Sequence, residues 1–239
     1  MTSASTEAAL LEQIHSTLTR IDGKTVELQR AIDGKLKWLP GPIQDGVVTG
    51  WNTFCEVMRR MWDNLNTMLS SMGSPSKLWT TADAWSDHVG VPVSGQVQTA
   101  EAGLLLTDDN WDGDAADAYR QMLPLQKAAL DKIKSAITDG LSTALREVAQ
   151  AIVIFWGALA AAFVALAIGL TGALGSSATI VGLPAAPIIA GGAAIAACTS
   201  MIIGAENLKS ICASANSTLR QKFDDSAFHG GHWPPAVKG

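Results

Sequence analysis

The stretch VAQAIVIFWGALAAAFVALAIGLTGALGSSATIVGLPAAPIIAGGAAIAACTSMIIGA, residues 148–205, contains no Asp, Glu, Lys, Arg or His. Two apolar runs, Val148–Leu174 and about Ala185–Ala205, lie on either side of a Gly-, Ser- and Pro-containing segment. Each run has roughly the 20 residues that an α-helix needs to cross the hydrocarbon core of a bilayer. We therefore expect an apolar helical hairpin with residues 175–187 at its tip.

Ala and Gly are frequent in this hairpin, and many of them are four positions apart. Small residues at that spacing allow two helix backbones to approach closely in lipid. Gly191 and Gly192 are interpreted as packing positions, since no strand precedes them as a nucleotide-binding loop would require. The residues predicted to form the membrane-inserting hairpin are Trp156, Gly157, Phe163, Gly169, Gly172, Pro184, Pro187, Gly191 and Gly192.

The N-terminal third also has helical periodicity. Residues 7–33 carry apolar side chains at spacings of three and four, which is a heptad seam interrupted at Thr25. This seam can pack on its own chain or form an intermolecular coiled coil. After a Pro-Gly-Pro break, residues 43–72 form a wide Trp- and Met-rich stripe, which is either a core face or an exposed partner-binding face.

Strand patterns are almost absent, so the predicted fold class is all-α, an elongated helical bundle. We expect a short helix over residues 76–88, a loop over 90–95 and a long helix from Asp114 into the apolar block. Four segments are predicted: an N-terminal amphipathic helical pair (1–73), a helical hairpin (74–147), the apolar hairpin (148–205), and a short helix with a flexible tail (206–239).

Composition excludes several function classes. The net charge is −5 and no Lys/Arg cluster occurs, which argues against a nucleic-acid partner. The three cysteines are too few and too scattered for a disulfide framework and are expected to be buried free thiols. The N-terminus lacks the pattern of a secretory signal peptide. No catalytic triad, phosphate loop or dinucleotide fingerprint is present, so we expect neither an enzyme nor a cofactor.

Two motifs bear on metal binding. Asp108-x-Asn110-x-Asp112-Gly113 matches the first half of a calcium loop, but the twelfth position, which needs a bidentate Glu, is Tyr119. His229 and His232 supply half of a metal site, with only Asp224 and Asp225 near them in sequence. Helix capping and a flexible tail are the preferred interpretations, and no metal is expected.

The acidic text DDNWDGDAADAYRQM, residues 108–122, has the features of a tight turn between two helices. Gly113 allows a backbone reversal with positive φ. Trp111 is expected to lie over the helix crossing, and Asp114 is a candidate N-cap. The pattern Trp111, Gly113, Ala115, Ala116 and Tyr119 resembles the WxG superfamily of small helical-hairpin proteins, exported by type VII (ESX-type) secretion in actinobacteria and firmicutes. The resemblance covers about residues 75–147.

This resemblance implies a helical hairpin that is recognised by the secretion ATPase and often paired with a partner hairpin. The matching turn residues here are Trp111, Gly113 and Tyr119. One departure concerns the family's companion signal, Tyr-x-x-x-Asp/Glu. The chain's one tyrosine is Tyr119, and the residue four positions on is Leu123. Export by this route would then depend on a partner that supplies the signal.

The sequence patterns predict a non-enzymatic, membrane-active chain, and the WxG resemblance implies a type VII-secreted effector, secreted or in the cell envelope, that is associated with virulence. Its apolar hairpin would insert into membrane lipid, alone or as an oligomeric pore. Homo- or hetero-oligomers are expected. Two alternatives stay open. The chain could be a structural or partner-binding secretion component whose hairpin stays buried in a soluble helical assembly, or an integral membrane protein with a soluble N-terminal domain.

Overall fold

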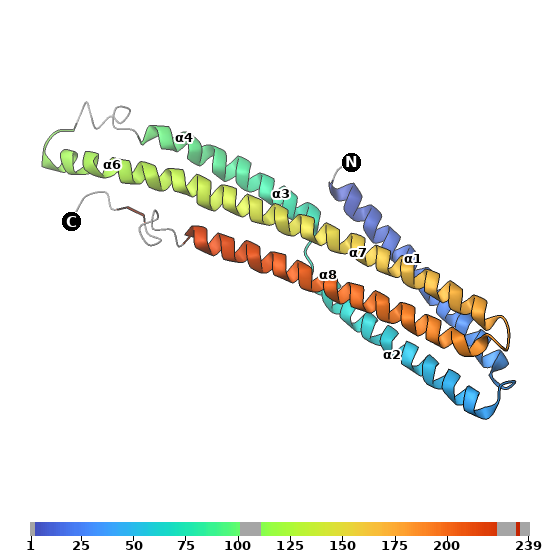
Figure 1. Cartoon of the computed structure of the whole chain (residues 1–239). Coiled ribbons are helices and arrows are strands. Elements are labelled where there is room, and N and C mark those ends of the chain that lie inside the picture. The colour runs from blue at the N-terminus through green and yellow to red at the C-terminus, as the bar shows by residue number, and fades with distance from the viewer. Residues whose placement is uncertain (1–2, 101–110, 224–232, 235–239) are drawn as a thin grey trace. The chain divides into compact units, whose positions relative to one another are not determined.

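The computed structural model describes residues 3–100, 111–223 and 233–234. Among these residues there is no strand, so the prediction of an all-α chain is confirmed. Four helices are long (Figure 1): α1 (Ser3–Leu36), α2 (Gly41–Ser71), α7 (Asp139–Ser177) and α8 (Ala186–Phe223). The shorter elements are α3 (Pro75–Trp85), η1 (Ser86–Gly90), α4 (Val91–Thr99), α6 (Asp114–Lys132), η3 (Ile133–Thr138) and η4 (Leu183–Ala185).

The chain divides into two compact units, each built from two separate stretches of sequence. Unit 1 comprises Met1–Gly73 and Ala151–Lys209, and unit 2 comprises Ser74–Gln150 and Ser210–Gly239. The N-terminal helical pair and the apolar hairpin, which we treated as separate segments, therefore belong to one unit. Helix α8 continues through residues 205–206, where a segment boundary was expected.

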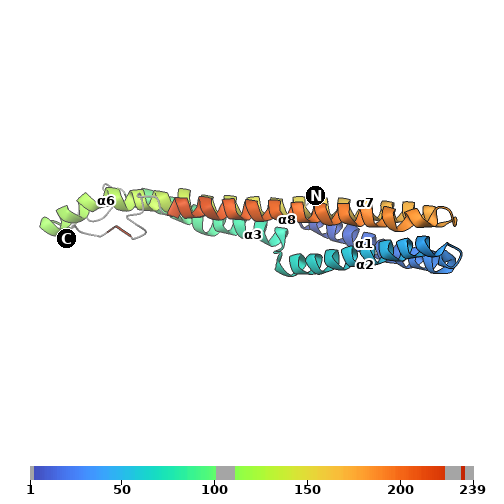
Figure 2. The ribbon, with the colours of Figure 1, turned by 60° about the horizontal axis from the view of Figure 1, so that its bottom comes forward.

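In unit 1, α1 and α2 lie on one side of the apolar parts of α7 and α8 (Figure 2). The α1 seam points into the core of this unit, as does the α2 stripe. Their buried side chains are Ile14, Ile21, Leu28 and Ile32 from α1 and Val47, Phe54, Met58, Met61 and Leu65 from α2. Both amphipathic faces are thus used within the chain, because burying them against the hairpin removes their apolar surface from water.

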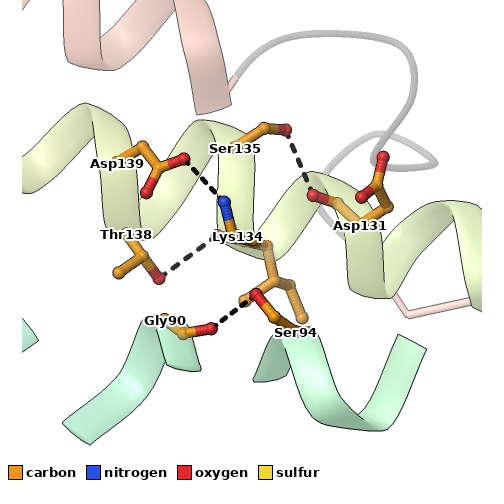
Figure 3. A network of polar contacts seen from close by, with 8 residues as sticks. Gly90, Ser94, Asp131, Lys134, Ser135, Thr138 and Asp139 are labelled. Carbon is orange, nitrogen blue, oxygen red and sulfur yellow. Dashed lines mark hydrogen bonds and ion pairs between the residues drawn. The ribbon is translucent and has the colours of Figure 1, made fainter. Parts of the chain in front are cut away.

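In unit 2, the segment α3–η1–α4 packs antiparallel to α6, η3 and the first turns of α7. Ser142 Oγ donates to the Ala82 carbonyl oxygen at 2.9 Å, and Arg146 forms a 2.7 Å ion pair with Asp83. Farther along, the π-helical turns η1 and η3 lie against each other (Figure 3). A Cβ added to Gly90 would be only 2.8 Å from Thr138 Cγ2, so glycine permits this close approach.

The expected loop over residues 90–95 is wrong, because Val91–Thr99 form helix α4. Pro92 lies within a helical path that runs without a break from α3 through η1 into α4, and the π-helical turn η1 directly precedes this proline, which has no backbone N–H to donate. Ser94 Oγ donates to the Gly90 carbonyl oxygen at 2.8 Å (Figure 3) and ties this turn to η1. Burial of Gly90 against η3 thus outweighs the turn propensity of its sequence.

Candidate functional site: the apolar hairpin and the Trp111 turn

The bulky residues of the first apolar run point into unit 1. Trp156 and Phe163 are both buried, together with Leu159, Leu166 and Leu170 on the same helix. Spacings of three and four place these side chains along one side of α7. This covered face of α7 is therefore part of the core that α1 and α2 complete.

The opposite side of the hairpin is exposed and apolar. On α7 the exposed positions follow spacings of four and three, and on α8 three exposed isoleucines are seven positions apart, which places them on one side of each helix. Ile154 of α7 and Ile203 of α8 line the same shallow groove of about 380 Å³, so the two exposed sides adjoin. We define the uncovered face by its large exposed side chains: Ile154, Ile168, Ile188, Ile195, Ile202 and Ile203.

Both helices of the hairpin are long and apolar enough to cross a membrane. Their most apolar windows differ in coverage, since 56% of the α7 window and only 22% of the α8 window is buried within the structure. An exposed contiguous apolar surface is uncommon on a soluble monomer and marks an interaction surface. The uncovered face carries no charged side chain that would favour contact with water.

Of the glycines predicted to shape the hairpin, Gly169 is required by packing. A Cβ on Gly169 would be 2.3 Å from Ala193 Cβ, so the α7 and α8 backbones approach closely there. A Cβ on Gly172 would make an ordinary contact, 3.7 Å from Ile189 Cγ2. No neighbouring atom lies within 4 Å of a Cβ placed on Gly157, Gly191 or Gly192, so these glycines make no close approach within unit 1.

Two further glycines of the hairpin were missed by the sequence reasoning. A Cβ on Gly204 would be 3.1 Å from the ring of Phe155, and one on Gly182 would be 2.3 Å from the Ser176 carbonyl oxygen. Gly204 lies at the end of the small-residue pattern and Gly182 in the turn. The small-xxx-small pattern could therefore have suggested only the first of them.

The prolines mark the start of the second apolar run. Pro184 is half-buried in η4, and Pro187 is buried at the first turn of α8. Pro187 packs against α2, since a Cβ on Gly50 would be 3.0 Å from Pro187 Cβ. The hairpin thus begins its second helix in direct contact with the N-terminal helical pair.

One polar group in the hairpin lacks a partner. Within the described part of the chain, the buried Nε1 of Trp156 has no hydrogen-bond acceptor. An indole N–H removed from water without an acceptor costs about 1–3 kcal/mol. The covered arrangement of α7 is therefore less stable than its apolar packing alone would make it.

The Trp111 turn is a separate cluster in unit 2. Gly113 is the N-cap of α6 and has φ of 104°, as expected for a residue in this turn. Asp114 is the first helical residue, so its prediction as N-cap is off by one position. The rings of Trp111 and Tyr119 are 5.8 Å apart. Arg120 Nη2 donates to the Trp111 carbonyl oxygen at 3.0 Å, and Nη1 to Asp117 at 2.9 Å.

The three cysteines are free, as predicted, but their predicted burial is wrong. Cys55 and Cys212 are exposed and Cys198 is half-buried. Partial desolvation raises the pKa of the Cys55 thiol above its ordinary value. The described residues contain no cluster of metal-ligating side chains. The tail histidines and residues 101–110, which include Asp108 and Asn110 of the calcium-loop motif, lie outside the described residues.

Comparison of the chain with protein-family models, with curated proteins and with solved structures found no match.

Proposed function

We propose that the α7–α8 hairpin of unit 1 docks on a lipid bilayer through its uncovered face and then inserts. The observation that carries this proposal is that α7 and α8 each contain an uncharged segment of membrane-spanning length, with exposed isoleucines on the side that α1 and α2 leave open. In α8, the run from Ala186 to Ala205 is about 30 Å long at 1.5 Å per residue, which matches the hydrocarbon core.

Insertion across the bilayer requires that the hairpin separate from α1 and α2. These helices carry charged residues on their outer sides, and lipid cannot replace water around such side chains at low cost. The buried, unpartnered indole N–H of Trp156 favours this separation, since indoles gain polar contacts at a membrane interface. Docking of the uncovered face is therefore the first step, and release of the covered face is the second.

We further propose that the chain reaches its target membrane by type VII export, with the Trp111 turn as the recognised element. The exposed Trp111, in tilted ring contact with Tyr119 and two residues before the positive-φ Gly113, is a preformed surface feature that a partner hairpin or the secretion ATPase can contact. In the native organism, Trp111→Ala should reduce the chain's amount in the medium. Trp233→Ala, at another exposed tryptophan, is the matched control.

The membrane proposal is tested by flotation of the full chain with phosphatidylcholine and phosphatidylglycerol vesicles. Ile195→Glu places a charge in the middle of the uncovered face and should abolish flotation. Val26→Glu is the matched control, because Val26 is an exposed apolar residue on α1 in the same unit. Equal flotation of both variants would contradict the proposal, as would a native chain that never floats.

A soluble assembly is the second candidate function. Ile188, Ile195 and Ile202 repeat every seven residues, which is also the spacing of a seam that packs against a partner helix. In that case the native chain would sediment as an oligomer in the absence of lipid, and Ile195→Glu would convert it to a monomer. Sedimentation velocity without vesicles separates this candidate from lipid docking.

A further inference from the structure

The end of unit 1 at the hairpin tip carries large exposed apolar side chains that the proposed docking face does not include. Val181 is 93% exposed, Ile180 46% and Trp38 65%. Ile180 and Val181 lie in the turn between α7 and α8, and Trp38 lies in the turn between α1 and α2. Both turns are at the same end of the unit (Figure 1).

The α7–α8 turn is built to hold these two side chains outward. Ser176 Oγ donates to the Gly182 carbonyl oxygen at 2.7 Å, and the Gly182 amide donates to Thr179 Oγ1 at 3.0 Å. The Leu183 amide donates to the Thr179 carbonyl oxygen at 3.1 Å, and the Leu183 side chain is fully buried. The turn is thus anchored at its base, and Ile180 and Val181 are its large apolar side chains that stay exposed.

The second turn is fixed to the first. Lys35 Nζ donates to the carbonyl oxygens of Ser177 and Ala178, the latter at 2.9 Å, which caps the C-terminus of α7. In the α1–α2 turn, the Trp38 amide donates to the Lys35 carbonyl oxygen at 3.0 Å. The exposed Trp38 thus lies in a turn whose backbone is hydrogen-bonded to Lys35, the residue that reaches the end of α7.

We propose that this tip, defined by Trp38, Ile180 and Val181, is the first part of the chain to contact the bilayer. This inference rests on the proposed membrane function and names the point of entry. Two exposed aliphatic side chains suit the acyl boundary, and tryptophan is the side chain enriched at the membrane–water interface. Lys37 Nζ lies 5.2 Å from the Trp38 ring centroid, which places a cation where lipid phosphates would meet it.

The charges around the tip nearly balance. Lys35 and Lys37 are accompanied by Asp33 and Asp45 on the neighbouring turns of α1 and α2. The tip therefore recognises the lipid interface by apolar contact and by the Trp38 ring rather than by net charge. Tip binding should persist in purely phosphatidylcholine vesicles and depend little on salt.

The order of contact is measured with an environment-sensitive fluorophore on single cysteines, after Cys55, Cys198 and Cys212 are changed to Ser. Labels at Val181→Cys, Ile195→Cys and Val26→Cys report the tip, the uncovered face and a matched α1 position. After stopped-flow mixing with phosphatidylcholine vesicles, the label at 181 should shift to the blue first. The label at 195 should follow and that at 26 should not change.

The double variant Ile180→Ser with Val181→Ser should weaken vesicle binding by roughly tenfold, since it removes the apolar groups that partition. Val48→Ser, at an exposed valine of α2, is the control and should bind as the native chain does. Circular dichroism checks that each variant keeps its helix content. Native binding by the double variant would overturn the tip proposal.

The possible outcomes distinguish failure of the tip proposal from failure of the proposed membrane function. If the chain floats but the label at 195 changes first, or the label at 181 stays open to aqueous iodide, the tip proposal is wrong and the membrane function stands. If neither flotation nor any label change occurs, both are wrong. If the label at 181 shifts without vesicles as the protein concentration rises, the tip joins copies of the chain, which also overturns the proposal.

Discussion

Helices α7 and α8 form the two arms of the apolar hairpin, and the fold covers them unequally. Their most apolar windows have mean hydropathies of 2.6 and 1.9, yet 56% of the first and 22% of the second is buried. The more apolar helix is thus the better sheathed, and the less apolar helix carries most of the exposed isoleucines. Hydropathy identifies the helices that are apolar enough to enter lipid. Which of these helices is exposed depends on how α1 and α2 pack against them.

The largest expected effect separates the covered and uncovered sides of α7. Phe163 is fully buried and Ile168 is exposed. Phe163→Ala should lower the free energy of unfolding by about 3–5 kcal/mol, because it removes a packed ring and leaves a cavity. Ile168→Ala, the matched variant, should change it by less than about 0.5 kcal/mol. Urea unfolding followed by circular dichroism measures both, and similar losses would show that the two sides are packed alike.

The next largest effect is expected at Gly169, where the backbones of α7 and α8 approach closely. Gly169→Ala should destabilise unit 1 by about 1–3 kcal/mol, since its new Cβ would overlap Ala193 Cβ. Gly157→Ala has open space around it and should stabilise the helix by about 0.5–1 kcal/mol. The same unfolding measurement applies. If the signs of the two effects agreed, backbone approach at Gly169 would not explain its role.

A smaller effect is expected at the contact between Lys35 of α1 and the C-terminus of α7. Lys35→Met removes the charged donor to the Ser177 and Ala178 carbonyl oxygens and should cost about 1–2 kcal/mol. Lys37→Met removes only a surface contact with Trp38 and should cost about 0.5 kcal/mol. Thermal unfolding of the two variants compares them directly. Equal losses would contradict a capping role that is specific to Lys35.

Much of the helical plan was predictable, because heptad spacing, the Pro-Gly-Pro break and the absence of charge are local features. The α1 seam, the apolar hairpin and the positive φ of Gly113 follow from such patterns. The helix at Val91–Thr99 could not be predicted from a local pattern, because it depends on the burial of Gly90 against Thr138, which is far away in sequence. Unequal coverage of α7 and α8 depends on where α1 and α2 pack, which no local pattern of the hairpin encodes.

Among the site residues, sequence patterns could propose glycines but could not rank them. Gly169 and Gly157 share the same Ala-rich surroundings, yet only Gly169 faces another backbone. Ile180 and Val181 were passed over because a two-residue apolar pair in a turn has no periodicity. Their exposure follows from the hydrogen bonds of Ser176, Thr179 and Gly182, which are visible only once the turn is folded.

The smallest effect on stability accompanies the most direct test of the central claim, that the uncovered face enters lipid. A nitroxide at Ile195→Cys, in the chain with its other cysteines changed to Ser, should alter stability by less than about 0.5 kcal/mol. With vesicles, we expect this label to become accessible to oxygen and protected from a water-soluble nickel chelate, while a label at Val26→Cys stays accessible to the chelate. Unchanged chelate access at residue 195 in the vesicle-bound chain would contradict the account.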